Sequence, residues 1–211
     1  MSKIENKTAS IAIAGTVGVG KSTLANKLGE MLDFKVMHEN VQSNPYLDKY
    51  YSNFNKWAFH LQIFFLAERF KDQKKMFSYG GGFIMDRSIY EDIEIFAKMN
   101  YEKGTMSEDD WDTYKSLFEA MVLSPYFEKP DLIIYLEGDI DHVVNRINER
   151  GRDMEVQTDV EYWRELDTRY KTWIDEINDM RVLRLNINEY DVHDDDSMTV
   201  IVEKIKKLVN A

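Results

Sequence analysis

The sequence predicts an α/β fold in which a five-stranded parallel sheet is flanked by helices on both faces. Two observations predict it. Short apolar segments alternate with longer helical patterns along the chain, as in folds built from strand–helix–strand units. Residues 11–14 are apolar throughout, as in a parallel strand buried on both faces, and they run directly into a glycine-rich loop and then a helix.

The elements follow in a regular order. We expect strands at 10–14, 34–39, 83–86, 131–136 and 182–186. We expect helices at about 23–31, from 53 or 55 to 79, and at 89–99, 107–123, 139–150, 159–180 and 198–209. Asn53 and Asn55 are the candidate N-caps of the long second helix, and three glycines from Gly80 end it. Residues 40–53 are predicted to form a loop, and the acidic segment 191–196 a solvated turn.

Composition narrows the class of protein. The 211 residues suit a single domain spanning 1–211, and the net charge of −11 argues against a nucleic-acid partner. The chain has no cysteine, residues 1–9 are polar without a signal-peptide pattern, and no apolar stretch approaches the roughly 20 residues of a membrane span. We therefore expect a cytoplasmic protein with small-molecule ligands, and no nucleic acid or membrane as partner.

The loop after the first strand matches G-x-x-x-x-G-K-[ST], the phosphate-binding P-loop. Its residues are Gly15, Thr16, Val17, Gly18, Val19, Gly20, Lys21 and Ser22, with Thr23 continuing into the helix. Lys21 is expected to reach the β- and γ-phosphates, and Ser22 to ligate Mg²⁺. The alternative is a chance glycine-rich turn, but such a turn needs neither a strand before it nor a helix after it. We therefore expect the chain to bind a nucleoside triphosphate with Mg²⁺.

Two carboxylates are predicted near this loop. Glu39 and Asp86 end the second and third strands, and ligands of parallel sheets bind beyond the carboxyl ends of the strands. Asp86 is suited to a magnesium site, although a strand-end aspartate can also be a simple helix cap.

Three arginines form a cluster in this acidic chain. Arg146 and Arg150 are four residues apart on one helix face, and Gly151 lets the chain turn to bring Arg152 towards them. Such a cluster suits a lid over transferring phosphates, and the alternative is a solvated helix end.

On the long helix, Gln62 and Arg69 share a face two turns apart. Gln62 lies between apolar neighbours, and its carboxamide suits paired contacts with a base edge. The alternative of an ordinary surface glutamine stays open.

With these motifs, the chain resembles the deoxynucleoside kinases, a family of P-loop kinase fold, and within it the bacterial deoxyadenosine kinases. The resemblance covers nearly the whole chain. It implies that Glu39 is the general base for the sugar 5′-hydroxyl and that Arg87 lies beside it. It also implies that Tyr51 and Glu155 hold the 3′-hydroxyl, and that Gln62 reads the base.

The resemblance implies further roles. Arg69 and Asp92 match the polar pair of the purine and deoxycytidine branch, and Phe96 matches the aromatic that stacks on the base. The lid, at about 146–158, would be formed by Arg146, Arg150 and Arg152. One departure is Asp86-Arg87-Ser88 where the common form is Glu-Arg-Ser, which puts direct metal contact in doubt. Another is Met154, where a relative has an acid.

The implied reaction is transfer of the ATP γ-phosphate to the 5′-hydroxyl of a 2′-deoxynucleoside, first deoxyadenosine, with deoxyguanosine and deoxycytidine as alternatives. The resemblance also implies deoxynucleoside triphosphate inhibition and a homodimer, for which the apolar helices 55–77 and 89–98 are candidates. Two other functions remain open at this point. One is a nucleoside monophosphate kinase of thymidylate kinase type, and the other is a regulatory P-loop switch that hydrolyses nucleotide slowly.

Overall fold

The computed structural model describes residues 9–41, 43–127 and 129–210. In this part of the chain, five parallel strands form one sheet in the order β2-β3-β1-β4-β5. The strands are β1 (Ser10–Ala14), β2 (Lys35–Met37), β3 (Phe83–Asp86), β4 (Leu132–Glu137) and β5 (Val182–Asn186). The predicted α/β fold is confirmed. β1, β3 and β5 have the predicted bounds and β4 is within one residue of them, but β2 is shorter than the predicted 34–39.

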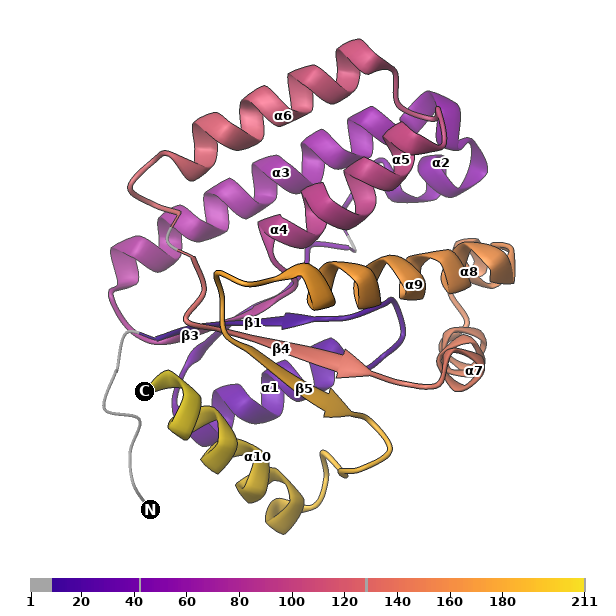
Figure 1. Cartoon of the computed structure of the whole chain (residues 1–211). Helices are drawn as coiled ribbons and strands as arrows, with labels where there is room; N and C mark the ends of the chain where they lie inside the picture. The colour runs from indigo at the N-terminus through magenta and orange to yellow at the C-terminus, as the bar shows by residue number, and fades with distance from the viewer. Residues whose placement is uncertain (1–8, 42, 128, 211) are drawn as a thin grey trace.

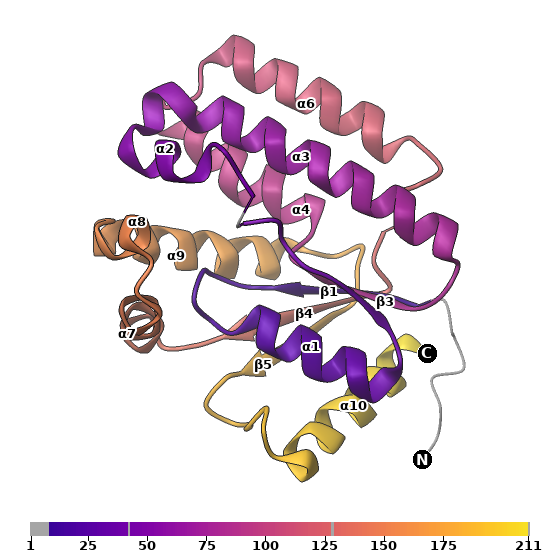
Figure 2. The ribbon, with the colours of Figure 1, turned by 180° about the vertical axis from the view of Figure 1, so that it is seen from behind.

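Helices cover both faces of the sheet (Figures 1 and 2). One face carries α1 (Lys21–Leu32) and α10 (Asp195–Val209). The other carries α3 (Phe54–Tyr79), α4 (Ile89–Glu91), η1 (Asp92–Ala97), α5 (Lys98–Glu102), α6 (Glu108–Val122) and α9 (Val160–Glu176). Three further helices, α2 (Leu47–Ser52), α7 (Ile140–Arg150) and α8 (Asp153–Val156), lie towards the carboxyl ends of the strands.

The central strand forms the core because its side chains are apolar on both faces. Residues 11–14 of β1 and 132–134 of β4 are fully buried between the two helical layers. A second apolar cluster lies between α3, α4, η1 and α6, and includes Leu66, Ile89 and Tyr114. The apolar surface that α3 and η1 turn away from the sheet is therefore covered by α6 of the same chain.

The caps of α3 agree with the sequence. The Asn53 side chain accepts a hydrogen bond from the Lys56 amide at 3.1 Å, so Asn53 is the N-cap and Asn55 lies inside the helix. Gly80 ends the helix with a φ of 66°, in the left-handed region that glycine adopts without strain.

Some expected bounds were wrong. The predicted loop 40–53 contains α2, whose Tyr50 packs against α3 and is buried. The acidic turn expected at 191–196 ends early, because the Asp194 side chain accepts from the Ser197 amide at 2.8 Å and starts α10 at Asp195. Likewise, α9 ends at Glu176 instead of residue 180, and the link after Arg150 contains α8.

The helix predicted at 89–99 is present, but its middle turn is a π-helix, η1. Among the described residues no helix is long and apolar enough to cross a membrane. The expectation that no signal peptide is present concerns residues 1–9, nearly all of which lie outside the described residues. That the chain is a single domain stays a prediction.

Candidate functional site

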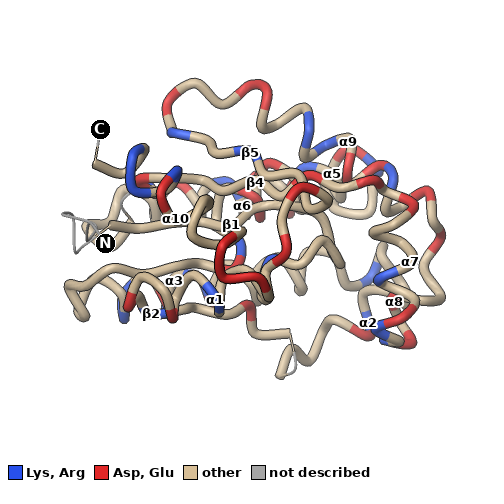
Figure 3. The backbone as a smooth tube through the Cα atoms, turned by 90° about the horizontal axis from the view of Figure 1, so that it is seen from below, with Lys and Arg blue, Asp and Glu red and all other residues tan. Residues whose placement is uncertain are grey.

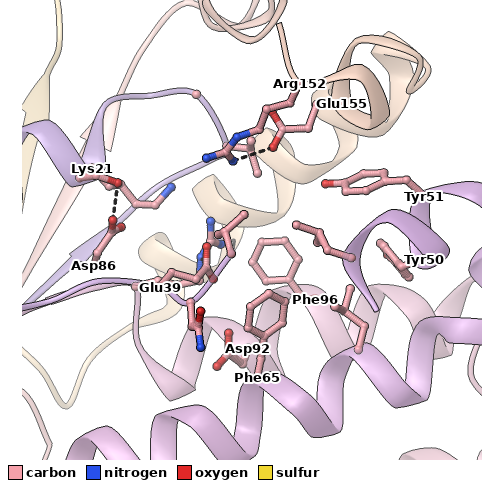
Figure 4. Close-up of a pocket in the computed structure, with 18 of the residues that line it drawn as sticks. Lys21, Glu39, Tyr50, Tyr51, Phe65, Asp86, Asp92, Phe96, Arg152 and Glu155 are labelled. Carbon is pink, nitrogen blue, oxygen red and sulfur yellow. Dashed lines mark hydrogen bonds and ion pairs between the residues drawn. The ribbon is translucent and has the colours of Figure 1, made fainter. Parts of the chain in front are cut away.

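A cavity of about 460 Å³ lies beyond the carboxyl ends of β1, β2 and β3. Because these three strands are neighbours, the P-loop after β1, Glu39 after β2 and Asp86 at the end of β3 meet at one edge of the sheet. Figure 4 shows the side chains around the cavity. The predicted site residues that line it are Val17, Gly18, Lys21, Ser22, Glu39, Tyr51, Gln62, Asp86, Arg87, Asp92, Phe96, Arg150, Arg152 and Glu155.

The conformation of the P-loop depends on its lysine and on its glycines. Lys21 is buried, and its Nζ donates to the carbonyls of Gly15 and Thr16 at 2.8 and 2.9 Å. Burial, together with the charge of Arg87, lowers the pKa of Lys21 to about 8. Gly18 has a φ of 83°, and a Cβ there would lie 2.6 Å from Cγ1 of Ile147, so only glycine fits.

Asp86 and Ser22 meet beside the P-loop, where the Ser22 hydroxyl donates to the Asp86 carboxylate. Burial acts to raise the pKa of Asp86, but His38 at 4.0 Å, the charge of Lys21 and the Ser22 hydroxyl outweigh it and lower the pKa to about 2. Asp86 is therefore ionised at neutral pH. A carboxylate and a hydroxyl oxygen are ligands that fit Mg²⁺.

One carboxylate oxygen of Glu39 contacts two guanidinium groups. Its Oε1 accepts a hydrogen bond from Arg69 Nη2 at 3.2 Å, and lies 3.1 Å from Arg87 Nε, an ion pair without hydrogen-bond geometry. The Glu39 side chain is 19% exposed, so it opens onto the cavity while both arginines are almost wholly buried. Arg69 does not line the cavity and acts on it through Glu39 and Asp92, whose Oδ2 accepts from Arg69 Nε at 3.1 Å.

The π-helix places two predicted residues in the wall of the cavity. Asp92 begins η1 and Phe96 lies near its end, and both face the site (Figure 4). Nδ2 of the Asn100 side chain donates to the Phe96 carbonyl at 2.8 Å, which holds this irregular turn. The Arg87 guanidinium lies over the Phe96 ring, 4.5 Å from its centre.

Gln62 is only 2% exposed and lines the cavity. Its Oε1 is buried and has no hydrogen-bond partner among the described residues. The alternative of a surface glutamine is therefore excluded. A buried amide oxygen without a partner is costly, and a ligand with a hydrogen-bond donor would satisfy it.

The three predicted lid arginines do not all contact the same partner. Arg150 and Arg152 both pair with the buried carboxylate of Glu155, and the Arg152 pair spans 3.1 Å. Arg146 does not line the cavity, and its Nη1 donates instead to the Val19 carbonyl of the P-loop at 3.3 Å. Charged residues of both signs lie around α7, α8 and α9 in Figure 3. Their shared helix face suggested that Arg146 and Arg150 act together. In the structure, Arg146 contacts the P-loop whereas Arg150 contacts Glu155.

Tyr51 also lies at the cavity, and Figure 4 shows its hydroxyl directed towards Glu155. Burial raises the pKa of Tyr51 well above its usual range, so the hydroxyl keeps its proton. The pairing of Tyr51 with Glu155 that the resemblance implied is thus compatible with their positions.

Several lining residues were not found from the sequence. The cavity wall also includes His38, Asn40, Val41, Leu47, Tyr50, Leu61, Phe65 and Tyr162. Tyr50 belongs to a short helix whose existence depends on packing against α3, so no local pattern indicated it.

Comparison with known proteins places this geometry in context. A model of the family described as deoxynucleoside kinase matches residues 11–210. The deoxyadenosine/deoxycytidine kinase of Bacillus subtilis (strain 168) is 56% identical over 205 residues, covering 97% of this chain and 94% of that protein. A solved structure of deoxyadenosine kinase from M. mycoides, with the products dCMP and a flexible dCDP bound, superposes with a TM-score of 0.81 at 31% identity, covering 94% and 99% of the two chains. Another structure of that enzyme, with dATP bound, gives 0.78 at 31% identity, covering 93% and 98%.

The glycine requirement in the P-loop can be tested with Gly18→Ala. The added Cβ collides with Ile147, so we expect ATP affinity, measured by calorimetric titration, to fall roughly tenfold or more. Gly104→Ala is the matched control. Gly104 also has a positive φ, 70°, but no atom lies within 4 Å of its added Cβ, so affinity should be unchanged. Normal ATP binding by Gly18→Ala would contradict the assigned loop packing.

Proposed function

Because this chain belongs to the deoxynucleoside kinase family, we propose that it transfers the γ-phosphate of ATP to the 5′-hydroxyl of a 2′-deoxynucleoside in nucleotide salvage. The observation that carries the proposal is the meeting of Glu39 with the P-loop at one cavity. They follow β2 and β1, the strands on either side of β3, and Gln62 and Phe96 line the same cavity. The site therefore has an acceptor for a proton, a cradle for phosphates and a surface for a base.

Glu39 is the proposed general base. The sugar hydroxyl must lose its proton as its oxygen attacks the γ-phosphorus, and a carboxylate within hydrogen-bond reach accepts that proton. Arg87 lies beside Glu39 and orients it. The bond from the γ-phosphorus to the bridging oxygen then breaks, and ADP leaves.

Positive groups neutralise the transferring phosphoryl group. Lys21 and the P-loop amides hold the phosphates, and Arg150 and Arg152 lie at the same cavity to act from the lid. Arg146 is proposed to support the loop through Val19. When bound, Mg²⁺ would neutralise charge on the phosphates, and Ser22 and Asp86 are the residues that would hold it.

The nucleoside is proposed to lie between Gln62, Phe96 and the sugar-binding pair. Phe96 would stack on the base, and Gln62 would bond to its edge. The Arg69–Asp92 pair stands beside them and leaves less room for the 5-methyl group of thymine. Tyr51 and Glu155 would hold the 3′-hydroxyl, which requires Glu155 to share its oxygens between the sugar and the lid arginines.

Deoxyadenosine is the proposed preferred acceptor. The Bacillus subtilis relative is named for deoxyadenosine and deoxycytidine, and an amide side chain can present its donor and acceptor to either base. Inhibition by deoxynucleoside triphosphates is also proposed. The structure of the M. mycoides enzyme with dATP supports this, because such a ligand carries both a base and phosphates.

Acceptor choice can be measured directly. With ATP and Mg²⁺, product formation from deoxyadenosine should exceed that from thymidine by roughly 10-fold or more, with deoxycytidine and deoxyguanosine between them. The four monophosphates serve as the control acceptors. If a monophosphate is the better acceptor, the protein is a nucleotide kinase. If ATP hydrolysis is unchanged when nucleosides are left out, it is a nucleotide-hydrolysing switch.

The role of Glu39 is tested by Glu39→Gln. The amide keeps the shape but cannot accept the proton, so turnover should fall by roughly 10²–10⁴ while deoxyadenosine still binds. Glu94→Gln is the matched control, because Glu94 is 46% exposed on η1 and pairs with Lys98. Turnover of Glu39→Gln close to that of Glu94→Gln would contradict a general base at this position.

A homodimer is also proposed, through a surface that only partly overlaps the expected helices 55–77 and 89–98. The apolar faces of α3 and η1 are largely covered by α6. Exposed apolar side chains remain on α6 (Leu117), directly after it (Leu123) and near the end of α3 (Phe77). A second copy of the chain would cover them.

Light scattering at micromolar concentration should give twice the chain mass of 24.9 kDa. Leu117→Asp should shift the measured mass towards one chain, because it places a charge in the apolar contact. The exposed α10 residue Val200 gives the control, Val200→Asp, which should leave the mass unchanged. A wild-type mass of one chain would rule the dimer out.

A further inference from the structure

Arg87 adopts an unusual backbone conformation at the bottom of the cavity. Its φ is 77°, in the left-handed region that side chains rarely adopt, and its side chain is almost completely buried. A residue keeps such a conformation only where its surroundings fix it in several ways. The contacts of its guanidinium on the side away from Glu39 are therefore informative.

Behind Arg87 lies a buried chain of hydrogen bonds. Arg87 Nη1 donates to the Tyr170 hydroxyl at 2.5 Å, and that hydroxyl donates to Glu91 Oε1 at 2.9 Å. Glu91 Oε2 accepts from the Ser88 amide at 2.7 Å, within a capping box at the start of α4. Tyr170 and Glu91 are both 0% exposed, and neither lines the cavity.

Comparison with Arg69, the second arginine at the site, shows what these hydrogen bonds provide for Arg87. Arg69 pairs with Glu39 on one side and with the buried carboxylate of Asp92 on the other. Arg87 pairs with Glu39 on one side, and through the Tyr170 hydroxyl it reaches Glu91 on the other. Each arginine therefore has a carboxylate partner in addition to Glu39. A buried cation without such a partner would be strongly destabilising.

We propose that Tyr170 and Glu91 are positioning residues, which fix the Arg87 guanidinium beside Glu39 and balance its charge independently of Glu39. The proposal rests on the proposed function, in which Glu39 takes the proton of the 5′-hydroxyl. Once protonated, Glu39 no longer balances either arginine. Asp92 and Glu91 remain as negative partners at that moment, so the arginines do not have to move during the reaction.

Tyr170→Phe tests the proposal by removing one oxygen atom. We expect kcat with deoxyadenosine to fall roughly 10- to 100-fold, because Arg87 loses the contact that fixes it, while the Kd for deoxyadenosine changes by less than about threefold. Tyr114→Phe is the matched control. Tyr114 is equally buried, on α6, and its hydroxyl has no hydrogen-bond partner among the described residues, so kcat should be unchanged.

Glu91→Gln tests the charge without removing the cap, because glutamine also serves in a capping box. Its amide oxygen can accept from Ser88, but its NH₂ then faces the Tyr170 hydroxyl, which loses its acceptor. We expect a similar loss of kcat. The double variant Tyr170→Phe with Glu91→Gln should lose about as much as the worse single variant, because both act through one chain of contacts.

The outcomes separate cleanly. Wild-type kcat in a folded Tyr170→Phe or Glu91→Gln variant would overturn the proposal, as would a loss of melting temperature alone or fully additive losses of kcat. If Tyr170→Phe does not fold, Glu91→Gln decides by the same kcat and Kd measurements. If the wild type and Tyr114→Phe both fail to phosphorylate any deoxynucleoside, the proposed function fails as well, whereas activity in those two proteins confines the failure to this inference.

Discussion

The arrangement of this site depends on burying positive charge in an acidic protein. Lys21, Arg69 and Arg87 are each less than 10% exposed, directly beneath a cavity suited to phosphates. An unpaired buried cation is destabilised by several kcal/mol, so each needs close acceptors. Lys21 has two P-loop carbonyls, Arg69 has Glu39 and Asp92, and Arg87 has Glu39 and Tyr170. These pairs fix the side chains before any substrate arrives.

The sheet brings these groups together because parallel strands end at the same edge. β3 lies between β2 and β1, so Asp86 at its end lies between the acid after β2 and the P-loop after β1. The π-helix η1 adds Asp92 and Phe96 to the cavity wall, where the nucleoside is proposed to lie. Arg150 and Arg152 both pair with Glu155, which links the proposed sugar site to the proposed phosphate site through one carboxylate.

Local sequence patterns predicted the features that are formed by residues close together in the chain. The P-loop, Asp86 at the end of β3 and the cap at Asn53 are all short-range signals, and the structure has each of them where expected, whereas β2 ends at Met37, two residues before Glu39. The helix α2 was missed because its stability comes from Tyr50 packing on α3. The contact between Glu91 and Tyr170 joins residues 79 positions apart, and the sequence around Glu91 indicates only a helix cap. Such pairs depend on tertiary packing, which a single sequence does not encode locally.

The central claim is that one cavity holds the sugar hydroxyl between Glu39 and the phosphates of the P-loop. A crystal structure with deoxyadenosine and a non-hydrolysable ATP analogue tests it most directly. We expect the 5′-oxygen within roughly 2.6–3.2 Å of a Glu39 oxygen and facing the γ-phosphate. A nucleoside bound elsewhere, or with its 5′-oxygen turned away from Glu39, would contradict the account.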